Sequence, residues 1–145
     1  MANTPTLLEL VYVSNAFPHD FPEQELERIL ASSRRRNAAI GVTGVLLYRT
    51  GTFLQLLEGP ADAVRRLYGE IIHHDPRHRA LVLCWEQPIT TRSFPQWWMG
   101  YVDGGTLDAA AGPLEPAWLS RGIAGLDLSG PGSTGRRLLM SLARS

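Results

Sequence analysis

Residues 44–59, GVLLYRTGTFLQLLEG, contain two apolar segments separated by a Thr-Gly dipeptide. The first segment is rich in Val and Leu, and the second alternates through Phe53 and Gln55, which is typical of half-buried strands. Thr50-Gly51 predicts a tight turn between them, and Gly59-Pro60 interrupts the second strand. The stretch therefore predicts a β-hairpin.

The segments on either side of this hairpin predict two helices and three further strands. Before it, residues 6–14 alternate as a strand, and apolar side chains spaced by three and four predict a helix over about 22–37. After it, a helix is expected over 60–74, followed by strands at 79–87 and around 97–102. Right-handed crossovers in a βαββαββ order place both helices on one face of a mixed sheet. We therefore predict an α+β, ferredoxin-like sandwich.

The composition describes a neutral chain with enough apolar residues for one core. Of its 145 residues 44% are hydrophobic, and 14 arginines balance 14 acidic residues with no lysine present. The missing basic excess argues against a nucleic-acid or membrane-surface binder. No apolar run reaches the roughly 20 residues of a membrane span, and the N-terminus lacks a signal-peptide pattern. We expect a soluble, cytoplasmic protein.

Neither a metal centre nor a disulfide is expected. Cys84 is the single cysteine, and no Cys/His cluster has the spacing of a zinc site. His73 and His74 are neighbours at a helix end and so face different directions. Arg34 and Arg35 are interpreted as a solvated helix C-terminus, where positive charge is favourable to the helix dipole.

The composition changes after Asp103. Residues 104–133 are rich in Gly, Ala, Pro and Ser, which indicates a linker. Residues 134–144, TGRRLLMSLAR, predict an amphipathic helix that is too short to be stable without a surface to dock on. We expect one domain over 1–103, and over 104–145 a linker with a short C-terminal helical extension.

Several chemically distinctive side chains are expected near the buried face of the sheet. Strand periodicity puts Tyr12 and Gln55 among apolar neighbours, and Asn37 ends the first helix. By the same periodicity Trp97 and Met99 share one face of the last strand. A buried phenol or amide is costly unless it is hydrogen-bonded. The alternatives are structural: Tyr12 bonded to a backbone carbonyl, Gln55 turned to solvent, and Asn37 as a left-handed cap. Spacing alone does not decide between a site and these alternatives.

Six segments of the chain carry distinctive motifs. They are VYVSNA at 11–16, ILASSRRRN at 29–37, GVTGVLLY at 41–48, FLQLLEG at 53–59, DPRH at 75–78 and PITTRSFPQWWM at 88–99. The most specific are FLQLLEG, the DPRH motif and an R-x-F-x-x-W-x-M pattern. In this order, the segments resemble the BLUF family of blue-light sensors that use flavin adenine dinucleotide (FAD), and the resemblance covers about residues 6–103.

The resemblance implies a role for each matching residue. Tyr12 matches the tyrosine that gives an electron to the excited flavin, and Gln55 matches the glutamine between that tyrosine and the flavin N5/O4 edge. Asn37 matches the asparagine that bonds the O4/N3 edge. Trp97 and Met99 match a pair whose arrangement changes with light. Further matching flavin contacts are Ile29, Ser33, Arg36 and Phe53 near the ring, and Arg77 and His78 near the ribityl-phosphate tail.

One departure from the family pattern concerns the second helix. Between Tyr68 and Asp75 the chain has one residue more than the family usually has. The resemblance therefore leaves open whether Ile71 or Ile72 faces the flavin opposite Ile29.

The resemblance implies a blue-light photoreceptor of the short, single-domain type rather than an enzyme. It would bind FAD non-covalently, with FMN or riboflavin as alternatives. It would signal through the last strand and the C-terminal extension, to an unknown protein partner or within a homo-oligomer. Two rivals use the same fold: a flavin-free scaffold that only mediates association, and an acylphosphatase-like enzyme that binds phosphate through an Arg and an Asn.

Overall fold

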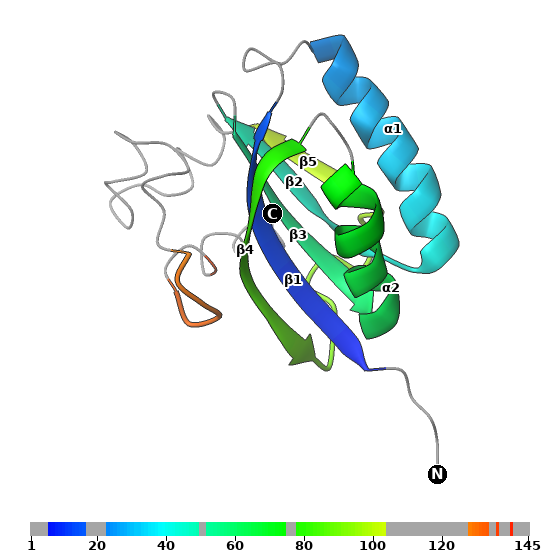
Figure 1. Cartoon of the computed structure of the whole chain (residues 1–145). Helices are drawn as coiled ribbons and strands as arrows, with labels where there is room; N and C mark the ends of the chain where they lie inside the picture. Colours follow the sequence, from blue (N-terminus) through cyan, green and yellow to red (C-terminus); the bar gives the residue numbers. More distant parts are fainter. Residues whose placement is uncertain are drawn as a thin grey trace.

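The structure is a computed structural model, drawn in Figure 1. It describes residues 6–16, 23–49, 52–74, 78–103 and 128–133, together with Arg136 and Met140. Its elements are β1 (Leu7–Ala16), α1 (Glu23–Ile40), β2 (Thr43–Arg49), β3 (Thr52–Pro60), α2 (Ala61–Arg66), a π-helical turn (Leu67–Ile71), a 3-10 turn (Ile72–His74), β4 (His78–Ile89) and β5 (Gly100–Asp103).

The five strands form one mixed sheet in the order β4-β1-β3-β2-β5. β1 is antiparallel to both β3 and β4, and β2 is antiparallel to β3. β5 is parallel to β2. Both helices lie on the same face of the sheet (Figure 1), because right-handed crossovers return the chain on one side. The predicted α+β, ferredoxin-like fold is confirmed.

The front face of the sheet, which the helices cover, contains the larger core. Alternate residues of β1 and β3 point into it, as period-2 strands require, and α1 and α2 contribute their inner sides. Burial of these apolar side chains stabilises the fold by roughly 1.5–3 kcal/mol each. The cluster consists of Leu8, Leu10, Tyr12, Leu26, Ile29, Leu30, Val42, Leu46, Phe53, Leu57, Val64, Leu67, Ile72 and Met99.

The back face of the sheet carries a second apolar cluster. Leu128 and Met140 pack against it and belong to the region predicted as linker and C-terminal helix. Arg136 and Met140 are helical, and the rest of the predicted helix over 134–144 lies outside the described residues. The cluster consists of Val11, Val45, Leu47, Leu54, Leu56, Trp85 and Phe94.

Helix α1 extends three residues beyond the predicted end at Asn37. It stops at Ile40, where Gly41 takes a left-handed φ of 74°. The backbone N–H of Val42 donates to the carbonyl of Asn37 at 3.0 Å, which is the long hydrogen bond of a Schellman motif. Gly41 is therefore the left-handed residue, and Asn37 lies inside the last turns of the helix.

The predicted second helix over 60–74 is α-helical only to Arg66. It continues as a π-helical turn over Leu67–Ile71 and a 3-10 turn over Ile72–His74. A π turn closes each hydrogen bond over one residue more than an α turn. The additional residue between Tyr68 and Asp75 is therefore accommodated without displacing the rest of the helix. Ile72 is buried in the front cluster, whereas the Ile71 side chain lies outside the described part.

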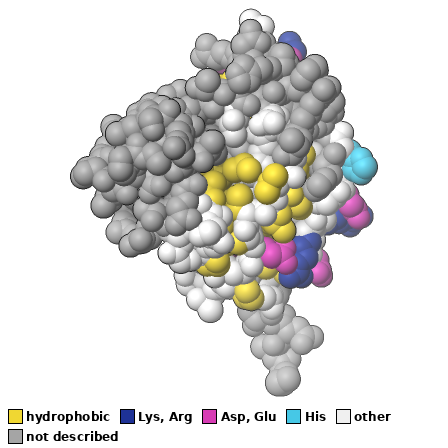
Figure 2. All heavy atoms as spheres, turned by 60° about the vertical axis from the view of Figure 1, so that its left-hand side comes forward, with side chains coloured by type: hydrophobic (Ala, Val, Ile, Leu, Met, Phe, Trp, Pro, Cys, Tyr) yellow, Lys and Arg dark blue, Asp and Glu magenta, His cyan; other side chains and the backbone are white. Residues whose placement is uncertain are grey.

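Strand β4 forms one edge of the sheet and is longer than the predicted 79–87. It includes Pro88, which an edge strand tolerates because one side of its backbone needs no partner. Val82 and Leu83 are 56% and 43% exposed on this edge. Figure 2, which turns this side of the molecule forward, shows hydrophobic side chains gathered beside acidic and basic ones.

Candidate functional site

Three buried side chains form a hydrogen-bonded row on the front face. Tyr12 of β1 and Gln55 of β3 are direct partners in the antiparallel ladder, so their side chains project next to each other. The Tyr12 hydroxyl donates to Oε1 of Gln55, and Nε2 of Gln55 donates to Sδ of Met99 at 3.2 Å. All three residues are at most 4% exposed. A carboxamide is thus held between a phenol and a thioether.

Asn37 lies on the side of α1 that faces the sheet and is fully buried. Its Nδ2 donates to the backbone carbonyl of Trp98 at 2.7 Å. Its Oδ1 is buried and has no hydrogen-bond partner in the described part of the chain. A buried acceptor without a donor costs about 1–3 kcal/mol. The amide is therefore suited to receive a hydrogen bond from a ligand.

Helix α1 holds the segment before β5 through two consecutive carbonyls. Asn37 bonds the carbonyl of Trp98, and Nε of Arg34 donates to the carbonyl of Met99 at 2.9 Å. Arg34 is exposed, as predicted, but it also holds this carbonyl, and α1 extends beyond it to Ile40. The available sequence signal was its spacing of three residues from Asn37, which puts both on neighbouring parts of one helix face.

The other expected ring contacts lie on the same front face. Ile29 of α1, Phe53 of β3 and Ile72 belong to the front cluster. Ser33 is buried, and its hydroxyl accepts a hydrogen bond from Arg36 at 3.4 Å. The structure thus brings the expected ring contacts from α1 and β3 to the face that carries the Tyr12–Gln55–Met99 row.

Three expected contacts are not placed. Arg77 lies outside the described residues. For Ile71 and His78 the structure describes the backbone but not the side chain. Their roles toward the cofactor remain predictions from the family resemblance.

The expectation that Trp97 and Met99 share a face is wrong. β5 begins only at Gly100, so both residues precede the strand, where period-2 alternation does not apply. Met99 is buried in the front cluster, whereas Trp97 packs against the back cluster with its ring centroid 5.2 Å from that of Phe94. The side chain that contacts Gln55 is therefore Met99.

Tyr68 is a neighbour of the site that the motifs did not indicate. It lies in the π-helical turn, and its ring centroid is 5.1 Å from that of Tyr12 at an angle of 52°. Burial raises the pKa of the Tyr68 phenol, and the nearby Cys84 adds to this. The signal that could have indicated it was its place on the inner side of the second helix.

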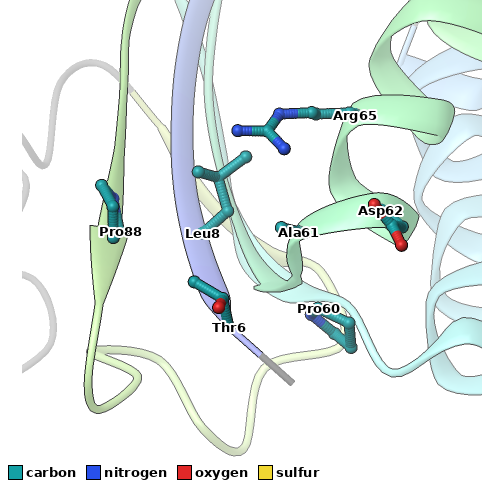
Figure 3. A pocket seen from close by; sticks show the side chains of 7 residues that line it. All are labelled: Thr6, Leu8, Pro60, Ala61, Asp62, Arg65 and Pro88. Carbon is teal, nitrogen blue, oxygen red and sulfur yellow. The ribbon is translucent and has the colours of Figure 1, made fainter. Parts of the chain in front are cut away.

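Described residues line two open grooves, one away from the Tyr12–Gln55–Met99 row and one beside Met99. One, of about 360 Å³, lies at the start of α2 and is drawn in Figure 3; it contains none of the expected flavin contacts. The other, of about 380 Å³, adjoins the site and is lined by Arg34, Gln96, Trp97, Trp98, Met99 and Gly100. The Met99 segment is thus held by α1 on one side and borders open space on another.

Neither a metal-binding cluster nor a membrane-spanning helix is found in the part of the chain that the structure describes. Within it, no three His, Cys, Asp or Glu side chains are grouped so that they could hold a metal ion. No helix among the described residues is long and apolar enough to cross a membrane.

The fold and the front face define the class of protein. In this α+β sandwich, the layer between the helices and the sheet is mostly apolar and contains a few convergent polar groups. Small-molecule cofactor sites have the same character. The family model described as BLUF, sensors of blue-light using FAD, matches residues 7–100. The chain belongs to this family and is a BLUF-type blue-light flavin sensor domain.

Relatives share this region at moderate identity. The chain is 42% identical over 93 residues to the photoactivated adenylate cyclase subunit beta of Euglena longa. This match covers 64% of this chain and 11% of that protein. It is 40% identical over 76 residues to the blue light- and temperature-regulated antirepressor BluF of Escherichia coli, covering 52% and 18%. It thus spans only a small part of these relatives.

Solved structures of similar length share the fold. The dark-state structure of BlrB, described as a BLUF protein, has a TM-score of 0.79 and 34% identity, and the match covers 97% of both chains. The photo-activated state of BlsA has a TM-score of 0.78 and 26% identity, covering 96% of both.

The residues on the front face fit the flavin that the family implies. The unpartnered Oδ1 of Asn37 can accept a hydrogen bond from a ring N–H. The side chains of Ile29, Ile72 and Phe53 supply an apolar environment suited to a planar ring.

Proposed function

We propose that the front face binds FAD non-covalently and that the Tyr12–Gln55–Met99 row detects its excitation. The observation that carries the proposal is the buried hydrogen-bonded row itself. The Gln55 amide can both accept and donate, and its donor is held only by a weak thioether acceptor, so little opposes rotation of the amide. The residues that would hold the cofactor are Tyr12, Ile29, Ser33, Arg36, Asn37, Phe53, Gln55, Ile72 and Met99, with Arg77 and His78 toward its tail.

The chain's own residues supply the proton movement. When bound, the flavin absorbs blue light and becomes a strong oxidant. Tyr12 is the oxidisable side chain, and loss of an electron makes its hydroxyl proton acidic. That proton has an acceptor in contact, Oε1 of Gln55. Protonated at this oxygen, the amide could give up a proton from Nε2 and rotate, because Met99 Sδ is only a weak acceptor. The electron from Tyr12 and the proton from Nε2 would pass to the bound flavin, and one electron and one proton would later return from it to Tyr12 and Gln55.

The signal would leave the site through the Met99 segment. If the Gln55 amide rotates, Nε2 leaves Sδ of Met99, whose carbonyl is bonded to Arg34. Displacement of Met99 would move Trp97 and β5 and shift the population between two arrangements. We propose that the output is a changed contact with a protein partner or a second copy. The cyclase and antirepressor activities in the relatives' names belong to those proteins.

The first experiment is an absorption spectrum of the purified protein loaded with FAD. Blue light is expected to shift the flavin band reversibly to the red, because the amide then donates a hydrogen bond to the ring edge. Loading with FMN and riboflavin in parallel shows whether the tail contributes, and Arg77 and His78 predict tightest binding for FAD. A protein that cannot be loaded, or whose spectrum is unchanged by light, would contradict the proposal.

Asn37→Ala is expected to weaken flavin binding about 10- to 100-fold, which corresponds to the loss of one or two buried hydrogen bonds. Titration of the apoprotein with FAD, followed by fluorescence quenching, measures this. The control is Ser32→Ala on the same helix, because the Ser32 hydroxyl donates to the carbonyl of Ile29 within that helix. Equal affinities of the two variants would exclude Asn37 from the site.

A further inference from the structure

A buried carboxylate is placed on the back face, on the opposite side of the sheet from the flavin site. Glu9 of β1 is fully buried. Its Oε1 accepts hydrogen bonds from Nε1 of Trp85 at 2.8 Å, Nε2 of Gln87 at 3.4 Å and Nε of Arg136 at 2.9 Å, and its Oε2 accepts one from the Arg136 guanidinium at 2.8 Å. Arg136 thus binds both oxygens in a fork. We call Glu9, Trp85 and Gln87 the arginine socket.

Charge pairing keeps the socket ionised. Burial alone would raise the pKa of Glu9, but hydrogen bonds from Arg136 and Trp85 and the charge of Arg136 hold the pKa below its usual value. A buried carboxylate without its cation is strongly unfavourable. The socket therefore requires a cation, and the chain supplies a guanidinium, which can bind both oxygens, from a residue 127 positions away in the sequence.

The residues around Arg136 are organised to present it. The Ser133 hydroxyl accepts the backbone N–H of Arg136 at 3.2 Å, which is the hydrogen bond of a helix N-cap. Ser133 is buried, and its own N–H donates to the carbonyl of Gly130 at 3.0 Å. Leu128 and Met140 pack on the apolar cluster beside the socket. The described part of residues 128–140, here called the C-terminal segment, thus combines one arginine with apolar side chains.

A second buried carboxylate joins this socket to the segment that the flavin site moves. Glu58 of β3 is the direct ladder partner of Glu9. Its two carboxylate oxygens accept the backbone N–H groups of Ser93 and Phe94, each at 2.8 Å. Burial raises the pKa of Glu58 despite these two hydrogen bonds.

Phe94 connects this carboxylate to the site. Its ring packs on Trp97, two residues before Met99. The charge of Glu58 also acts on Arg136 and contributes to its raised pKa, after the larger effect of Glu9. A displacement of Ser93 and Phe94 would remove hydrogen bonds from the Glu58 carboxylate. This would change the charge of Glu58 and therefore its attraction for Arg136.

We propose that the back face is a docking surface whose recognition element is the arginine socket, and that the C-terminal segment occupies it in the dark as the output element. The docking of the C-terminal segment in the socket does not depend on the proposed light sensing, whereas its role as the output element rests on it. The ligand class is a guanidinium on a helical turn with flanking Leu or Met side chains. Light moves Met99 and Phe94, weakens the socket and releases the segment.

Hydrogen exchange of the flavin-loaded full chain tests both halves. In the dark, Arg136→Gln and Glu9→Gln are expected to speed exchange in residues 128–140 about tenfold or more, because a charge-assisted pair is lost. Arg66→Gln, which removes one exposed charge from α2, is the control and should leave it unchanged. Arg136→Lys should give an intermediate rate, because an ammonium cannot form the fork.

Illumination then separates the two hypotheses. Wild-type exchange in residues 128–140 should rise toward the Arg136→Gln level, while that variant changes little on illumination. Equal dark exchange in wild type and Arg136→Gln would overturn the socket. Unchanged exchange in a wild type that still shows the red shift would overturn its role as output. Absence of the red shift would refute the light sensing, whereas the dark comparison would still decide the socket.

Discussion

Replacing Tyr12 by phenylalanine is expected to leave the flavin bound and to abolish the red shift under blue light. The ring remains in the front cluster, so packing changes little. The hydroxyl that donates to Oε1 of Gln55 is lost, and with it the proton that the amide must receive before it can rearrange. The unpaired Oε1 should cost about 1–3 kcal/mol of unfolding free energy. Absorption difference spectra after illumination measure the effect.

Tyr68→Phe is the matched control for this variant. Its ring contacts that of Tyr12, and the substitution likewise removes one phenolic hydroxyl next to the same cluster while keeping the ring. The light-induced shift should persist in Tyr68→Phe. Gln55→Leu should behave like Tyr12→Phe, because leucine can neither accept from the phenol nor donate after rearrangement. A normal photocycle in Tyr12→Phe or Gln55→Leu would contradict the assigned roles.

Gly44→Ala is expected to destabilise the fold by about 3 kcal/mol or more, and to lower the midpoint of thermal unfolding by about 10 °C. Gly44 lies in β2 opposite Leu57. A Cβ there would lie 2.0 Å from the backbone carbonyl oxygen of Leu56. Backbone atoms of a paired strand cannot move aside without breaking the ladder. The N–H of Gly44 also donates to the carbonyl of Trp97 at 2.8 Å, so displacement of β2 should disturb the Met99 segment.

Gly69→Ala provides the comparison for that variant. Gly69 lies in the π-helical turn, and a Cβ there would meet nothing within 4 Å. Alanine favours helical backbone over glycine by up to about 1 kcal/mol, so this variant should match or exceed wild-type stability. Thermal unfolding followed by circular dichroism measures both. A Gly44→Ala midpoint within about 2 °C of wild type, less than 1 kcal/mol, would show that β2 has room for the methyl group.

Local patterns were sufficient for the order of elements. The hairpin over 44–59, the strand over 6–14 and the helix over 22–37 follow from periodicities that each segment contains by itself. Family motifs added the identities of Tyr12 and Gln55, whose place on one face follows from strand alternation. Boundaries were less predictable, because α1 continues past Asn37 and ends only at the left-handed Gly41, and a π turn takes up one residue after Arg66.

Contacts between distant segments were decided only by the tertiary structure. Alternation failed before β5, so only packing showed that Met99 contacts Gln55 while Trp97 turns to the back cluster. Arg34 and Met99 are 65 residues apart, and Glu9 and Arg136 are 127 apart. The sequence by itself determined which side chains are available for the proposed flavin site and proton movement. Their partners depend on which strand and helix faces meet, and no local periodicity contains that information.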